Sequence, residues 1–271
     1  MASTKTPNTA DLKQPTNKAS TTVAVRPAGN VVSIAEQLKA QAAAMGERTA
    51  PPGGNKIRVT QDKKFILPNG QTTAGPIDVC IVDFRAIHNF WEEKFDPKNI
   101  KPVACFAIAT NPKGMVPSNN APLKQDDGKG CDTCPMNAFG SEGTGKACKE
   151  GRRLALLPAS DDGLDVDHEA DLWTIDVSPT AIKGFDSYVQ GVARTFGQPP
   201  VAFLTEVAFD ESQTYAKLVF SNPRPVVSIG DALARQAEAK EILEVEPDVS
   251  NFVSVASAPK AAARKVASAR R

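Results

Sequence analysis

Apolar and polar residues alternate in short runs between residues 56 and 221, which is the pattern of half-buried β-strands. In the run 77–84 (IDVCIVDF), Val79 and Ile81 share one face while Cys80 and Val82 share the other. Gly, Pro, Asn and Asp separate the runs and predict turns. The pattern predicts strands at 56–60, 64–67, 77–84, 101–109, 154–158, 171–177, 201–209 and 215–221.

Three other stretches have the period of a helix. Ser33 to Glu36 forms a capping box before an Ala-rich run that Gly46 ends. Ser178 and Pro179 supply an N-cap and a first-turn proline for a helix that ends at Gly197. A last amphipathic helix is predicted at 228–244.

Strands and helices do not alternate regularly, which argues against a parallel α/β sheet. We expect a mainly β (α+β) fold, built as a partly closed OB-like (oligonucleotide-binding) barrel with an inserted metal-bound loop of four cysteines, a packing helix and disordered tails. The expected parts are a disordered basic tail (1–32), a short helix and linker (33–54), an OB-like β domain (55–225) with the metal-binding loop at 105–153, a C-terminal helix (226–246) and a disordered basic tail (247–271).

The net charge of +1 is unevenly distributed. Residues 1–30 carry a net +3 and residues 258–271 a net +5, which leaves −7 for residues 31–257. A polyanion would therefore bind at a local basic patch or at the tails, although tails that only keep the chain soluble explain the charges as well. The sequence shows no apolar run of membrane-spanning length and no signal-peptide pattern, so we expect a cytoplasmic protein without membrane contact.

Four of the five cysteines are spaced as metal ligands. Cys131 and Cys134 form a C-x2-C pair, Cys148 follows in a Lys/Arg cluster, and Cys105 lies on a predicted strand upstream. Thiolates in this pattern bind Zn²⁺ tetrahedrally, so we expect these four cysteines to hold one structural zinc ion. An iron–sulfur cluster on the same thiolates is the weaker alternative.

Other interpretations of these residues are a redox C-x2-C pair or ordinary loop cysteines. A redox pair is expected at a strand-to-helix junction, whereas this pair lies among Gly, Asn, Lys and Asp. Cys80 has no partner at ligand spacing and is expected to be a buried, inert thiol. His88 is expected to be structural. It or His168 becomes a ligand only if Cys105 points away from the other three cysteines.

Two stretches combine aromatic rings with cations, as single-strand binding requires. The first contains Phe90, Trp91 and Lys94. The second contains Phe139 with four cations around the metal loop, namely Lys146, Lys149, Arg152 and Arg153. If the metal folds the loop against the barrel, the two stretches border one groove, in which Trp91 and Phe139 stack on bases. The alternative places the Trp in the core and leaves residues 146–153 as a solvated face.

Motifs of common enzyme classes are not found. The sequence has no G-x-S-x-G, Walker or H-E-x-x-H motif, and Cys105 is not followed by the Glu that a zinc deaminase needs. We therefore expect a binding protein that is not an enzyme.

The cysteine stretch also resembles a known pattern. Its parts are C-x2-C-P-x-N-x-F-G-S from Cys131, G-K-A-C-K from Gly145 and R-R-L-A-L-L from Arg152. The pattern is similar to that of phage and prophage single-stranded DNA-binding proteins, over roughly residues 56–225. The resemblance implies a metal-stapled oligonucleotide-binding barrel that acts in phage DNA replication or recombination inside a bacterial host. Single-stranded DNA and replication or recombination proteins are the implied partners.

Two other functions remain open at this point. One is a zinc-containing transcription or protein-interaction factor, which the acidic body suits. The other is an iron–sulfur enzyme acting on nucleic acid, which the four cysteines allow. The basic end of the chain differs from the acidic tail with which single-strand binders commonly recruit partners, so direct contact with DNA is the role left open for residues 258–271.

Overall fold

The computed structural model describes residues 34, 38, 41, 54–93 and 100–254. The chain divides into two units, 1–49 and 50–271, and almost every described residue belongs to the second. In the first unit, Ile34, Leu38 and Gln41 are helical, within the helix predicted from the capping box. The predicted tail at 1–32, Lys94 and residues 255–271 lie outside the described residues.

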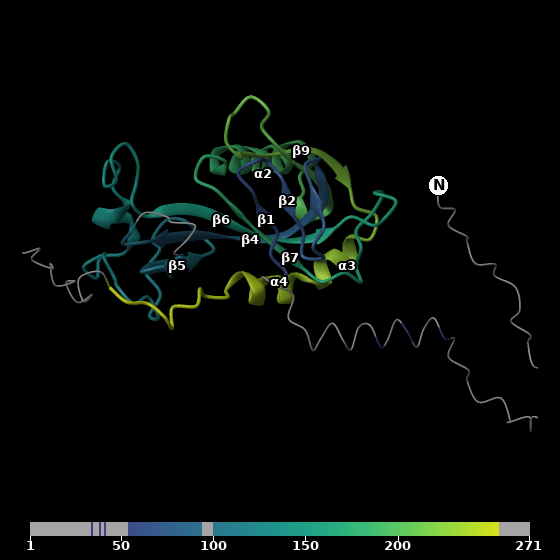
Figure 1. Cartoon of the computed structure of the whole chain (residues 1–271). Coiled ribbons are helices and arrows are strands. Elements are labelled where there is room, and N and C mark those ends of the chain that lie inside the picture. The colour runs from purple at the N-terminus through teal and green to yellow at the C-terminus, as the bar shows by residue number, and fades with distance from the viewer. Residues whose placement is uncertain (1–33, 35–37, 39–40, 42–53, 94–99, 255–271) are drawn as a thin grey trace, which may run out of the picture. The chain divides into compact units, whose positions relative to one another are not determined.

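The second unit contains two antiparallel sheets (Figure 1). The smaller has the order β1-β2-β3, with β1 (Arg58–Val59), β2 (Phe65–Ile66) and β3 (Thr72–Thr73). The larger has the order β7-β6-β4-β8-β9, and β5 pairs with β4. Its strands are β4 (Ile77–Phe90), β5 (Cys105–Ala109), β6 (Lys149–Pro158), β7 (Trp173–Val177), β8 (Phe203–Phe209) and β9 (Leu218–Pro225).

Apolar residues pack on both faces of the larger sheet. One face, with Val79 and Ile81, is covered by α2 (Ile182–Phe196) and by the small sheet, whose Phe65 stacks on Phe209 at 4.3 Å between ring centroids. The opposite face, with Cys80, is covered by α3 (Ile229–Ala234) and α4 (Gln236–Leu243). Figure 1 shows α2 and α4 on opposite sides of the strands. The alternation in 77–84 therefore reflects burial on both faces of a central strand.

Strand β4 is longer than the sequence predicts, because it continues through Arg85 to Phe90. A register shift between Ile81 and Asp83 marks an irregularity of the β-bulge kind, and beyond it β4 runs between β5 and β6. The neighbouring strands bury polar residues of β4 such as Arg85 and His88. Because these residues are polar, the sequence does not show the apolar alternation that predicts a strand here. Cys105 and Cys148 lie on the chain segments that flank this second half of β4.

The helices also differ in detail from the prediction. The Ser178–Ala181 segment forms a turn, and α2 itself begins at Ile182, while Gly197 ends it in a left-handed conformation with φ of 66° as predicted. The single helix predicted at 226–246 is two helices that meet at Arg235. Residues 247–254, predicted to be tail, are packed: Val249 contacts the cluster that contains Cys105 and Phe106.

The structure confirms a mainly β protein with packing helices. It does not confirm a barrel: among the described residues β7 and β9 are opposite edges of the larger sheet. The segment that leads into the small sheet pairs with the β7 edge through a parallel bridge between Lys56 and Thr174. No helix in the described part of the chain is long and apolar enough to cross a membrane.

Candidate metal centre

Three neighbouring strands place two of the cysteines on one face. Cys105 pairs with Phe90 across β4 and β5. Lys149 pairs with Asn89 across β4 and β6, so Cys148 continues this ladder opposite Phe90. Because direct cross-strand partners share a face, Cys105 and Cys148 flank Phe90 on the same side of the sheet. Strand pairing brings these two cysteines, which are 43 positions apart in the sequence, to either side of β4. The alternation of side chains along each strand then places both on the same face.

The loop between β5 and Cys131 is held against the free edge of β5. Ser118 N donates to Phe106 O at 2.9 Å and Cys131 N donates to Met115 O at 2.8 Å. Gly130, directly before Cys131, has a φ of 86°, and a Cβ at this position would lie 3.1 Å from Met115 O. The turn into the C-x2-C pair therefore requires glycine.

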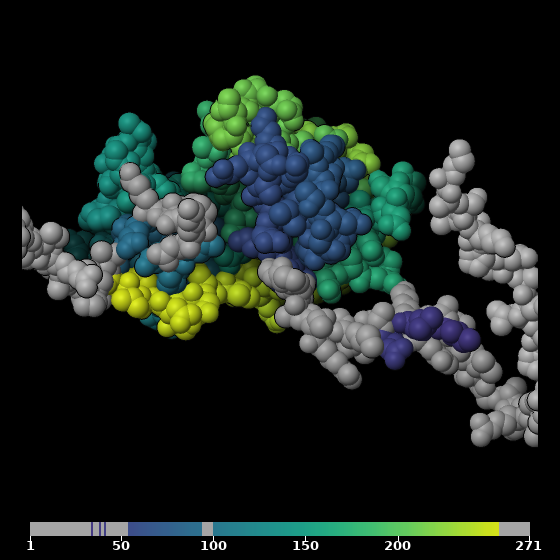
Figure 2. Space-filling view, in the orientation of Figure 1, coloured from purple at the N-terminus to yellow at the C-terminus, as the bar shows by residue number. Residues whose placement is uncertain are grey.

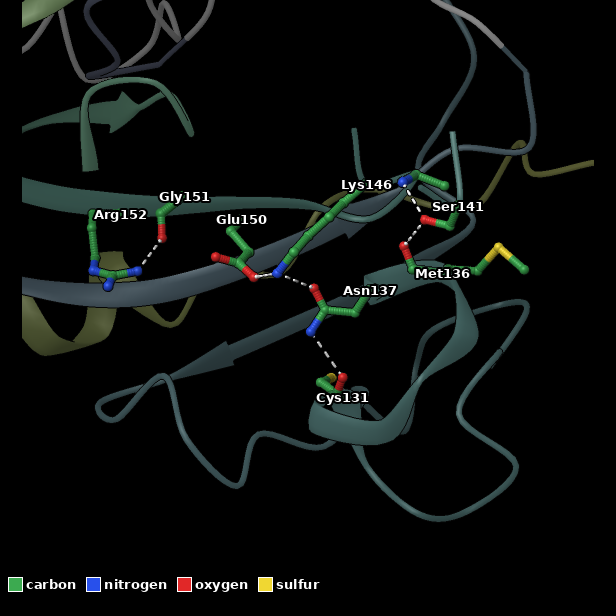
Figure 3. Close-up of polar contacts among 9 residues, drawn as sticks. Cys131, Met136, Asn137, Ser141, Lys146, Glu150, Gly151 and Arg152 are labelled. Carbon is green, nitrogen blue, oxygen red and sulfur yellow. Dashed lines mark hydrogen bonds and ion pairs between the residues drawn. The ribbon is translucent and has the colours of Figure 1, made fainter. Parts of the chain in front are cut away.

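Two short 3₁₀ helices, η1 (Cys131–Thr133) and η2 (Pro135–Asn137), carry the C-x2-C pair. Figure 3 shows how this segment is tied to β6. Asn137 Nδ2 donates to Cys131 O at 2.9 Å, and Lys146 Nζ donates to Asn137 Oδ1 at 3.2 Å and to the Glu150 carboxylate. Cys148 N donates to Met136 O at 2.8 Å. The pair is thus fixed above the strand face that carries the other two cysteines.

All four predicted ligands line one small cavity of about 10 Å³, which we call the cysteine cavity. Cys105, Cys131 and Cys148 are buried, Cys134 is half-buried, and all are free thiols. Cys105 therefore faces its three expected partners. Within the described ranges, no three or more His, Cys, Asp or Glu side chains are already arranged around a common metal position. The donors fit a soft divalent ion in type and number, since four thiols line the same small cavity.

The thiols of the cavity also influence one another electrostatically. Burial, with further contributions from the nearby Cys105 and Cys134, raises the pKa of Cys131 to about 12. Burial and the other three cysteines raise the pKa of Cys148 to about 12. Burial also raises the pKa of Cys105, against a backbone hydrogen bond at Gln125 that lowers it. At neutral pH these thiols lose their protons only if a positive charge lies beside them. A bound metal cation would supply that charge.

Cys80 and the two histidines were not predicted to bind the metal together with the four cysteines, and the structure gives each different surroundings. Cys80 is fully buried under α3 and α4, its Sγ donates to Val201 O at 3.3 Å, and burial raises its pKa to about 12. His168 is exposed and does not line the cysteine cavity. His88, in contrast, does line it.

The aromatic residues predicted to bind nucleic acid have different surroundings. Phe90 is half-buried and lines the cysteine cavity, so its ring belongs to the interior. The Trp91 side chain is 39% exposed and that of Phe139 is 80% exposed. Phe139 precedes a tight turn closed by the bridge between Glu142 and Gly145. Only the last two rings are open to a partner.

The four cations predicted around the metal loop to bind phosphate all form ion pairs within the chain. Lys146 pairs with Glu150, and Lys149 pairs with Glu142. Arg152 is buried and pairs with Asp186 of α2 at 3.1 Å. Arg153 pairs with Asp176 at 3.3 Å and donates to Val245 O at 2.7 Å. Their sequence neighbourhood resembles a basic patch, yet each of the four cations has a carboxylate partner, and β6 directs the two arginines to carboxylates on α2 and β7.

A segment that the sequence did not indicate runs along this region. Residues 244–254 leave α4 and pass beside the loop, as the yellow chain in Figure 2 shows. Glu246 accepts hydrogen bonds from Ser118 Oγ and from Asn120 Nδ2, and Ser254 Oγ donates to Glu92. This strap ties the cysteine region to the helical face. Nothing in its local sequence indicates where it docks.

Comparison with protein-family models, curated proteins and solved structures finds no match to this chain. The similarity to phage single-strand binders therefore stays a prediction from the cysteine pattern alone.

Proposed function

We propose that the chain binds single-stranded nucleic acid, with DNA as the expected form, on a lobe whose fold is completed by a structural zinc ion. We call residues 100–153 the cysteine lobe. In this proposal the four cavity cysteines bind the zinc and leave no open coordination position, so the metal stabilises the lobe and does no chemistry. The protein would be a binding protein of phage DNA replication or recombination on a partly closed OB-like scaffold, as the sequence pattern implies.

Charge segregation within the described chain supports this surface. The cysteine lobe has eight Lys and Arg residues and five Asp and Glu residues, a net +3. Residues 154–254 have six basic and 17 acidic residues, a net −11. Even after the charge of about −2 of a zinc tetrathiolate, the lobe is far less acidic than the following segment. Between these two segments, the charge balance therefore favours a polyanion at the lobe.

In this proposal, the lysines that contact phosphates are not those predicted from the sequence. Lys113, Lys124 and Lys129 lie on the loop that leads to the C-x2-C pair, and all three are exposed. Within the described ranges none of them is paired with a carboxylate, and Lys124 Nζ only donates to Asn119 Oδ1 at 3.4 Å. Exposed ammonium groups without a carboxylate partner are suited to following a backbone of phosphates.

Phe139 is the observation that carries the proposal. A phenyl ring that is 80% exposed beside a turn contributes little to folding, while it presents a face on which a base can stack. It lies on the segment between Cys134 and Cys148, so a metal bound by both would hold it in place.

We expect Phe139→Ala to weaken single-strand affinity by about 1–3 kcal/mol with little change in the free energy of unfolding, because the ring stacks on a base and not on the core. Fluorescence anisotropy with single-stranded DNA, duplex DNA and RNA oligonucleotides, repeated at several salt concentrations, measures the affinity and the number of phosphate contacts. Leu164→Ala is the control, since Leu164 is 69% exposed on the acidic segment. Wild-type protein that binds no oligonucleotide at low salt, or an unchanged affinity of Phe139→Ala, would disprove this function.

A further inference from the structure

His88 places a polar atom without a partner at the wall of the cysteine cavity. Its side chain is 4% exposed, and Nδ1 is buried with no hydrogen-bond partner among the described residues. An unsatisfied buried polar atom is destabilising, so it calls for an explanation, such as a partner that is present only in the functional state. The residue also lines the cavity together with the four cysteines.

The strand register places this ring beside the sulfurs. His88 lies two residues before Phe90 on β4 and therefore on the same face. Its cross-strand partners are Ala107 on β5 and Glu150 on β6. Each of these lies two positions from a cavity cysteine, Cys105 or Cys148. The imidazole thus occupies the row next to the row of cysteines on the same three strands.

The chemistry of a tetrathiolate centre calls for hydrogen-bond donors. Four thiolates around one divalent ion keep an excess of negative charge in a buried place, and donors directed at the sulfurs offset it. A neutral imidazole has one N–H, which either ring nitrogen can carry, so Nδ1 can be the donor. The neighbouring Glu150 carboxylate is bound by Lys146 and does not need this proton.

We propose that His88 is a positioning residue of the metal centre, whose Nδ1–H donates a hydrogen bond to a metal-bound cysteine sulfur. The assignment rests on the proposed tetrathiolate site. It gives the buried, unpartnered nitrogen a function that the residue's position in the sequence does not indicate. Loss of a partner of this kind weakens metal binding about 10–100-fold.

The test compares two substitutions of nearly equal size in the full-length, zinc-loaded protein. His88→Leu removes the donor, whereas His88→Asn keeps an amide near the position of Nδ1. Competition with a chromophoric zinc chelator should show affinity about 10–100-fold lower for His88→Leu and close to wild type for His88→Asn. His168→Leu, outside the cavity, should have no effect. If His88→Leu does not fold, His88→Gln, which shifts the amide beyond this position, replaces it with the same expected weakening.

Three results would overturn the proposal. Equal affinities of the Leu and Asn variants would show that only the packing of the ring matters. A cobalt-substituted spectrum that changes from mixed nitrogen and sulfur ligation to all-sulfur ligation in His88→Leu would make His88 a ligand. Wild-type protein that binds no stoichiometric metal would remove the metal centre itself, and this failure is seen before any variant is made.

Discussion

Cys148→Ser is expected to abolish tight binding of one zinc ion per chain. A serine hydroxyl is a poor zinc ligand, and Cys148 is one of four thiols that converge on the cysteine cavity. We expect the zinc affinity to fall further than the ~10–100-fold that follows when only a hydrogen-bond partner of a ligand is removed. Elemental analysis of purified protein and chelator competition measure the change.

The same substitution should also loosen the cysteine lobe. Residues 110–148 contain no strand and only the short helices η1 and η2, so the metal would supply much of their stability. Hydrogen exchange should accelerate in this segment and stay slow in the sheet core around Leu154 and Leu156.

Cys80→Ser is the matched control, because Cys80 is equally a buried free thiol but lies under α3 and α4. It should keep one zinc ion per chain. Full zinc content in Cys148→Ser, or equal zinc loss in both variants, would show that Cys148 is not a specific ligand.

Phe185→Ala is expected to lower the free energy of unfolding by about 3–5 kcal/mol, because it removes a large side chain from a closed core. Phe185 is fully buried on α2 and makes edge contacts with Phe84, at 5.1 Å between centroids, and with Phe220, at 5.0 Å. These contacts join the helix to β4 and β9. Urea denaturation monitored by circular dichroism measures the loss.

Phe196→Ala on the same helix is the comparison, since Phe196 is 47% exposed and should cost much less. Zinc content should be unchanged in both variants where they are folded, because the cysteine cavity lies elsewhere on β4. A cost at Phe185 no larger than that at Phe196 would show that α2 is not part of the cooperative core.

The approximate positions of most strands and the C-x2-C pair were predicted from the sequence because both depend on local rules. A period of two places Val79 and Ile81 in one core, and C-x2-C spacing brings two sulfurs together within a single turn. Cys105 was the candidate for the fourth ligand because it lies on a predicted strand upstream, and the register of β5 on β4 shows why it shares a face with Phe90.

The features that sequence reasoning missed depend on distant partners. The G-R-R run predicts an exposed basic patch, but Arg153 is the cross-strand partner of Asp176. His88 has no neighbour at ligand spacing in the sequence, and its place beside the cysteines exists only across three paired strands. The docked strap at 244–254 depends on single contacts such as that of Glu246 with Asn120, which have no sequence period.

X-ray absorption at the zinc edge of the full-length protein tests the central claim most directly, because it reports the atoms that surround the metal. We predict four sulfurs at about 2.3 Å from the zinc and no lighter atoms bound to it. Nitrogen or oxygen bound to the zinc at about 2.0–2.2 Å, or protein purified without stoichiometric metal, would contradict the tetrathiolate centre.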